Sequence, residues 1–226
     1  MQDLALRYQR AIERFLRKVL NDPAAAADLT HNLLVKVLRG DFGRWEGRGR
    51  FRDYLKAAVR HEAHSYLQGA RKLQFTDLSG VADGTGTLDD LWDVEWAREV
   101  KTLAWHNLLR YELQDRRGRN QHGRSGNVFY TLLRLRVKYP RDRIPDLTRR
   151  LAEKTGRPYT EANVRQQLAR ARRKLVALLT QEVLRGLPPD QTTAIDQELL
   201  TQNLTRYVRK LRGEKETPPR GQPAAD

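Results

Sequence analysis

The sequence predicts an all-α protein made of two small helical domains joined by a flexible acidic linker. Apolar residues recur every three or four positions along most of the 226-residue chain, and the alternation typical of strands is absent. The charge also changes along the chain, because residues 73–97 contain no Lys or Arg but repeated Asp and Glu, between two basic blocks. Gly80, Gly84 and Gly86 break the first half of this acidic stretch and favour a linker.

The composition indicates a partner that carries many negative charges. Lys and Arg number 43 against 28 Asp and Glu, a formal net charge of +15, which favours nucleic acid or an anionic membrane surface. No apolar run reaches the roughly 20 residues that span a bilayer, and the start of the chain lacks a signal segment. The absence of cysteine excludes disulfides, thiolate metal sites and cysteine nucleophiles. We therefore expect a soluble, cytoplasmic protein with no membrane partner.

The N-terminal block predicts three helices. The first has an apolar face at Tyr8, Ile12, Phe15, Leu16 and Val19. Asp22 followed by Pro23 is typical of a helix start, and the second helix ends at Gly40. The third begins near Phe51 and carries the stripe Phe51, Tyr54, Leu55, Ala58, Val59, Ala63, Tyr66 and Leu67.

Residues 41–50 form a glycine-rich loop in which aromatic and basic residues are interleaved. Its members include Phe42, Arg44, Trp45, Arg48 and Arg50. Rings stack on unpaired bases while arginines neutralise phosphates, so this loop is a candidate for binding single-stranded nucleic acid. The alternative is that the aromatic residues belong to the core, which we expect for Phe51 and Tyr54 but not for Trp45.

The second basic block predicts five further helices before a tail. A helix is expected over about 89–115, a basic loop over 116–126 and a helix over 128–138. A helix from Pro145 to Gly156 precedes one that Thr160 caps and that Pro188 ends. A last amphipathic helix is expected over about 193–212, followed by a disordered tail.

The segment from Leu147 to Leu175 has the spacing of a helix-turn-helix, whose second helix enters the major groove of DNA. The residues expected to contact bases or nearby phosphates are Thr160, Asn163, Arg165, Gln166 and Gln167. Those expected to contact phosphates are Arg170, Arg172, Arg173 and Lys174. The alternative is an ordinary helical hairpin with a basic, solvated face.

Catalytic and metal sites are not expected. His61 and His64 are three residues apart, whereas the zinc-protease motif needs four. Asp89, Asp90 and Asp93 are explained by the preference of acids for a helix start. No nucleophile–base pair is evident, so we expect a non-enzymatic protein without metal or cofactor.

Three segments together resemble bacterial extracytoplasmic-function sigma factors. Residues 26–38 read A-A-D-L-T-H-N-L-L-V-K-V-L and resemble the second-helix motif of that family. Phe51-Arg52-Asp53-Tyr54-Leu55 with Val59-Arg60-His61 resembles the next family helix, and residues 164–175 resemble its recognition helix. Ala27, His31, Asn32, Tyr54 and His61 replace the usual family residues, which leaves open how tightly polymerase is bound and which base is preferred.

The resemblance implies a sigma factor that binds core RNA polymerase and directs promoter recognition and melting. It implies a region-two domain at 1–72, an acidic linker at 73–88, a region-four domain at 89–186 and an extension at 187–226 that resembles planctomycete-type members. Polymerase would be bound by Asp28, Leu29, His31, Asn32 and Val35. The melted minus-ten element would be bound by Arg44, Trp45, Arg48, Arg50, Arg52, Lys56, Arg60, His61 and His64. The helix-turn-helix would bind the duplex minus-thirty-five element, and an anti-sigma factor is left open as a further partner.

Two other functions remain open from the sequence. A helix-turn-helix regulator that does not bind polymerase would explain residues 147–175 but not the aromatic–arginine loop. A basic RNA-binding adaptor would use its charge alone and would bind unrelated RNAs with comparable affinity.

Overall fold

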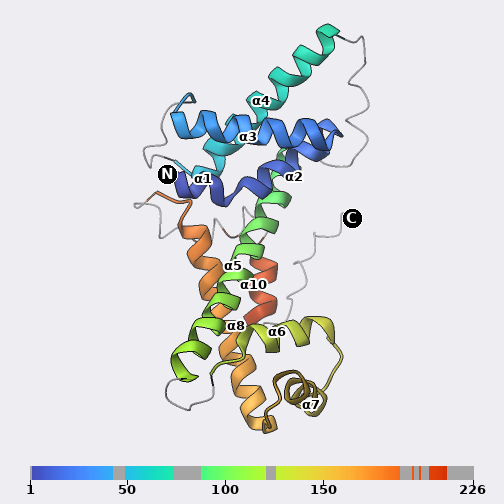
Figure 1. The fold of residues 1–226 in the computed structure, drawn as a ribbon, viewed down its shortest axis with the longest axis vertical. Coiled ribbons are helices and arrows are strands. Elements are labelled where there is room, and N and C mark those ends of the chain that lie inside the picture. Colours follow the sequence, from blue (N-terminus) through green and yellow to red (C-terminus); the bar gives the residue numbers. More distant parts are fainter. Residues whose placement is uncertain are drawn as a thin grey trace, which may run out of the picture. The chain divides into compact units, whose positions relative to one another are not determined.

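The computed structural model describes residues 2–42, 49–73, 88–120, 126–188, 195, 199 and 204–212. Every regular element in these ranges is a helix, which confirms the predicted all-α class (Figure 1). The chain divides into two compact units, residues 1–103 with 179–203 and residues 104–178 with 204–226. Two long helices, α5 (Leu88–Asn120) and α8 (Glu161–Leu184), each contribute residues to both units.

The N-terminal helices of the first unit are α1 (Gln2–Arg7), α2 (Gln9–Leu20), α3 (Pro23–Arg39) and α4 (Phe51–Leu73). The first predicted helix corresponds to α2, and Tyr8, whose fully buried ring stacks on Trp96 of α5 with 3.9 Å between ring centroids, lies between α1 and α2. Asp22 caps α3 as predicted, accepting hydrogen bonds from the amides of Ala24 and Ala25 at 2.9 and 3.0 Å. Gly40 ends α3 at a φ of 86°, a left-handed conformation that glycine adopts readily.

The core of the first unit contains residues far apart in the sequence. Trp92 and Trp96 of α5 are 0% and 2% exposed, and the Phe15 ring meets the Trp92 ring edge-on at 5.5 Å. Near the end of α8, Val183 is also buried, and Gly186 accepts a hydrogen bond from the Phe51 amide at 2.9 Å. The start of α5 and the end of α8 therefore pack with the N-terminal helices.

Buried carboxylates join these elements. Glu95 accepts a hydrogen bond from Arg14 at 2.6 Å and pairs with Lys18 at 2.8 Å, while Glu99 accepts from Arg14 at 2.7 Å. Glu182 of α8 receives two hydrogen bonds from Arg7, at 2.8 and 2.6 Å. Each carboxylate is almost fully buried but is paired, as a charge removed from water requires.

The second unit holds the later part of α5, with α6 (Phe129–Lys138), α7 (Ile144–Thr155), the first part of α8 and α10 (Thr205–Arg212). Helix α5 continues to Asn120, five residues beyond its predicted end, into the predicted loop 116–126. Buried Glu112 accepts hydrogen bonds from the amide and hydroxyl of Thr131 at 2.9 and 2.6 Å, which ties α5 to α6. Trp105 donates to the Tyr207 hydroxyl at 2.8 Å and so joins α5 to α10.

The predicted helical hairpin is present in this unit. Helix α7 ends at Gly156, whose φ is 67°, and the Thr160 hydroxyl accepts the Asn163 amide at 3.2 Å at the start of α8. Leu147, Leu151, Val164 and Leu168 are buried. The order of α7, the turn at Gly156 and α8 is that of a helix-turn-helix.

The predicted domain boundaries at residues 72, 88 and 186 stay a prediction, because they concern functional regions rather than compact units. Most of the acidic linker, residues 74–87, lies outside the described residues. Helix α10 occupies the end of the helix predicted at about 193–212. The predicted tail, residues 213–226, is also outside the described part.

Candidate polymerase and nucleic-acid interfaces

Helix α4 carries a row of three cations four residues apart, Arg52, Lys56 and Arg60, which the resemblance assigns to the melted strand. In the structure this row faces two acids of α5. The Lys56 ammonium lies 3.1 Å from Asp89, and Arg60 donates to the same carboxylate at 2.9 Å. Arg52 Nη1 lies 3.4 Å from the carboxylate of Asp93.

Arg52 differs from the other two cations because it is buried. Its side chain is 6% exposed, and its Nε and Nη1 atoms have no hydrogen-bond partner among the described residues. The nearest charges are Asp93 and the neighbouring Asp53, whose Oδ1 lies 3.5 Å from Arg52 Nε. Burial raises the pKa of Asp93, while the positive charges of Arg52 and Lys56 act to lower it. In this structure Arg52 is part of the packing between α4 and α5.

The remaining residues assigned to the melted strand fall into two groups. His61 and His64 are exposed on α4; the His61 ring meets the Phe42 ring edge-on at 5.8 Å, and His64 lies 3.3 Å from the Gln68 amide nitrogen. Arg50 is half-buried just before α4. Arg44, Trp45 and Arg48 of the predicted aromatic–arginine loop lie outside the described residues.

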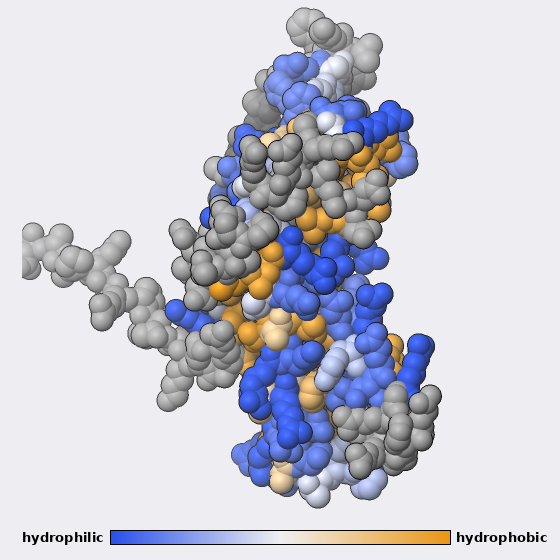
Figure 2. Space-filling view, turned by 90° about the vertical axis from the view of Figure 1, so that its left-hand side faces the viewer, coloured by the Kyte–Doolittle hydropathy of each residue, from blue (hydrophilic) through white to orange (hydrophobic). Residues whose placement is uncertain are grey.

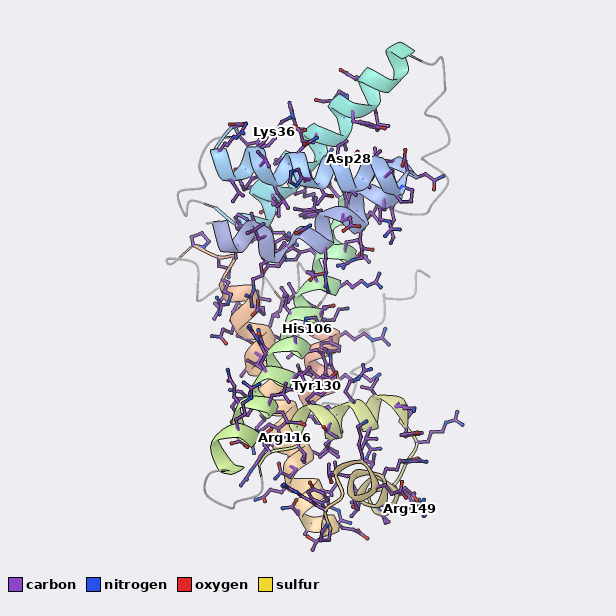
Figure 3. The ribbon with its side chains drawn as sticks, in the orientation of Figure 1. Asp28, Lys36, His106, Arg116, Tyr130 and Arg149 are labelled. Carbon is purple, nitrogen blue, oxygen red and sulfur yellow. The ribbon has the colours of Figure 1, made fainter. Side chains whose placement is uncertain are left out.

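Helices α3 and α4 form a groove of about 430 Å³ that includes three of the five residues assigned to polymerase. Leu29, Asn32 and Val35 line it from α3, and Tyr66 lines it from α4. Asp28 and His31 are exposed on α3 outside this lining (Figure 3 labels Asp28). The groove combines apolar and polar side chains, which suits a protein partner.

One ion pair fixes the two helices at this groove. Lys36 of α3, labelled in Figure 3, donates to both carboxylate oxygens of Glu62 on α4 at 2.8 Å each. Glu62 belongs to the segment His61-Glu62-Ala63-His64, which was considered above as a metal motif. Its carboxylate instead pairs with Lys36. In the described part of the chain, no group of three or more His, Cys, Asp or Glu residues is placed to hold a metal ion.

Helix α8 presents a polar face opposite its buried one. Four of the residues assigned to the minus-thirty-five element are exposed there, at helical spacing: Asn163, Gln166, Arg170 and Arg173. Thr160 is exposed just before the helix. Over the second unit, the face seen in Figure 2 is largely covered by hydrophilic residues.

Four further residues of the predicted set are half-buried or paired with another side chain. The Lys174 ammonium lies over the Tyr111 ring at 4.2 Å, and the buried Gln167 Oε1 has no hydrogen-bond partner in the described residues. Arg172 is half-buried near Arg136, and its charge adds to burial in lowering the pKa of Arg136. Arg165 is exposed but pairs with Glu161 one turn earlier at 2.8 Å.

A cavity of about 370 Å³ in the second unit was missed from the sequence. Arg116, Lys154 and Arg157 line it, and they come from α5, α7 and the turn after α7. Tyr159 also lines it, and its hydroxyl is buried without a hydrogen-bond partner among the described residues. No local motif could have identified this cavity, because its cations meet only after folding.

These surfaces define an all-helical protein with a polar groove on α3–α4, a cationic row on α4 and a helix-turn-helix at α7–α8. Residues 4–73 match the family described as Sigma-70 region 2. The match spans the segment from α1 to α4, so this part of the chain is similar to region 2 of the sigma-70 family. No curated protein matches the chain, and neither does any solved structure.

None of the helices in the described ranges is both long enough and apolar enough to cross a bilayer.

Proposed function

We propose that the chain is a sigma factor of the extracytoplasmic-function type, a non-enzymatic specificity subunit that binds core RNA polymerase in the cytoplasm. The observation that carries this proposal is the match of residues 4–73 to Sigma-70 region 2, in a chain that also contains a helix-turn-helix. Its partners are then core polymerase and promoter DNA, both melted and duplex. No cofactor is required, because the function is binding.

The groove on α3–α4 is the proposed contact with polymerase. Leu29, Asn32 and Val35 line it, and the resemblance assigns these same positions to the polymerase interface. The exposed Asp28 and His31 extend this surface along α3. A groove that is partly apolar can bury area against a helical partner, and its polar rim can fix the register.

The second part of the proposal is that the two units contact different parts of the promoter DNA. Helix α4 and the loop before it contact the melted minus-ten element, with stacking and charge supplying the affinity for single strands. The exposed face of α8 reads the duplex minus-thirty-five element, in the manner of other helix-turn-helix recognition helices. One helix, α4, then holds the opened strand, and a different helix, α8, positions the intact duplex.

Binding to core polymerase tests this proposal against its two rivals. The change Asn32→Arg puts a large cation into the groove and is expected to reduce capture by sigma-free core polymerase at least tenfold. Gln9→Arg is the matched control, because Gln9 is exposed on α2 outside the groove and the charge change is the same. The measurement is the stoichiometry of the purified complex on gel filtration.

Absence of a stoichiometric complex with the unmodified chain would contradict the proposal. Tight duplex binding without polymerase would then favour a helix-turn-helix regulator. Similar affinity for unrelated RNAs, with no preference for promoter DNA, would favour a basic RNA-binding adaptor.

A further inference from the structure

The cationic row of α4 meets an acidic row at the start of α5. Asp89 and Asp93 are four residues apart, so both lie on one face of α5, as Arg52, Lys56 and Arg60 lie on one face of α4. The contacts are Arg60–Asp89 at 2.9 Å, Lys56–Asp89 at 3.1 Å and Arg52–Asp93 at 3.4 Å. All five residues belong to the first compact unit.

We propose that the first turn of α5 is an internal competitor of single-stranded nucleic acid for this row. Lys56 and Arg60 exchange the Asp89 carboxylate for strand phosphates, whereas Arg52 stays with Asp93 and serves only to hold α5 on α4. This inference rests on the proposed function in one respect, the binding of a melted strand along α4. The resemblance treats the three cations alike. The proposal divides them into two that bind strand phosphates, Lys56 and Arg60, and one that holds α5 on α4, Arg52.

The outer contact can be exchanged because it is open to water. The side chains of Asp89 and Arg60 are 51% and 52% exposed, so solvent and salt screen their attraction. The Lys56 side chain is 18% exposed and shares the Asp89 carboxylate with Arg60, so Arg60 is the more accessible of the two cations. A single strand supplies a phosphate at every nucleotide and can therefore neutralise both cations at once.

The inner contact cannot be exchanged without disrupting the core. The Arg52 side chain is only 6% exposed, so a phosphate has little access to its guanidinium group. The adjacent Trp92 is fully buried, and Trp96, one turn further, stacks on Tyr8. Detaching this part of α5 would expose both indoles to water, whereas Asp89 lies one turn earlier, at the second residue of the helix.

The test measures binding of a labelled single-stranded DNA oligonucleotide to the full chain by fluorescence anisotropy. Asp89→Asn is expected to tighten binding about fivefold at low salt, and the gain should fade as salt rises. Glu13→Gln is the matched control, because it makes the same charge change on α2 of the same unit, where Glu13 is paired only with Arg17 in the described residues. Its effect measures the general gain from one more positive charge.

Two further variants identify the groups responsible. In the Asp89→Asn background, changing Lys56 and Arg60 to Ala should remove the gain. Asp93→Asn should give no gain beyond the control but should lower the thermal midpoint, because the buried Arg52 then keeps only the neighbouring Asp53 as an acidic partner. Thermal unfolding of every variant shows whether the fold is intact.

The inference is overturned if Asp89→Asn binds no more tightly than Glu13→Gln, or if its gain survives loss of Lys56 and Arg60. A gain for Asp93→Asn equal to that for Asp89→Asn would contradict the division of the row. These results are independent of polymerase binding. A chain that shows the predicted competition but forms no complex with core polymerase would refute the proposed function and leave the inference standing.

Discussion

At the scale of single residues, buried carboxylates that pair with cations help to hold the first unit together. Burial alone would raise the pKa of Glu95, but hydrogen bonds from Lys18 and Arg14, together with their positive charges, hold it below its ordinary value. The folded state therefore prefers the ionised form. A carboxylate with a lowered pKa stabilises the fold above its unfolded pKa, and this stabilisation is lost as the pH falls through the folded pKa.

The change Glu95→Gln tests this account. At neutral pH we expect it to lower the free energy of unfolding by about 2 kcal/mol, the contribution typical of hydrogen bonds to a charged group. The difference from the unmodified protein should shrink as the pH falls below the ordinary value of 4.5, because the native carboxylate then takes up a proton. Denaturant unfolding over a pH series measures both effects.

Glu13→Gln is the comparison for this experiment as well. The Glu13–Arg17 pair is exposed, with its closest atoms 3.8 Å apart, and its loss should change stability by less than about 0.5 kcal/mol. A Glu95→Gln protein as stable as this comparison, or a stability difference that grows as the pH falls, would show that the buried contact does not act as described.

At the scale of elements, helix α8 carries two kinds of residue. Those on its exposed polar face form the proposed DNA-reading surface, whereas others, such as Lys174, contact the rest of the second unit. Gln166→Ala is expected to change the preferred base at one position, at a cost of about 1–3 kcal/mol for the best site. Arg170→Ala should weaken binding to all sequences alike. It should also reduce by about 1 the slope of the logarithm of the binding constant against the logarithm of the salt concentration, here called the salt slope. Both expectations follow from the exposure of these residues on the polar face.

Lys174→Ala is the matched control for Arg170→Ala. It also removes one positive charge from α8, but its ammonium lies over the Tyr111 ring rather than on the exposed face. Duplex DNA selected with the unmodified chain is titrated with each variant at several salt concentrations. If Lys174→Ala reduced the salt slope as much as Arg170→Ala, the assignment of faces on α8 would be wrong.

The sequence was most informative where the cause of structure is local. Asp22 and Gly40 were correctly predicted to bound α3, because a capping side chain and a left-handed glycine act within a single turn. Gly156 and Thr160 gave the turn between α7 and α8 in the same way. The short helix α1 was not predicted, and neither was the stacking of Tyr8 on Trp96, because the two rings are far apart along the chain.

Site residues were less predictable than helices. Asp89 and Asp93 were explained from the sequence as acids at a helix start, and their contacts with α4 were not anticipated. Tyr66 was expected in the core but is 38% exposed and lines the groove on α3–α4. Periodicity gives the face of an isolated helix, whereas its neighbours decide which part of that face is covered.

At the scale of the whole molecule, the proposed function uses surfaces on two compact units. The match to Sigma-70 region 2 covers residues 4–73, and the helix-turn-helix lies well beyond it. The net charge of +15 supplies attraction to nucleic acid but no choice of sequence. Under the proposed function, selection of a start site therefore depends on polymerase, α4 and α8 acting together.

Run-off transcription with sigma-free core RNA polymerase and a library of duplex templates tests this claim most directly. With the full chain added, transcripts are expected to begin at a defined position on a subset of templates that share two upstream elements. Transcripts that start at the same scattered positions with and without the chain would contradict the account.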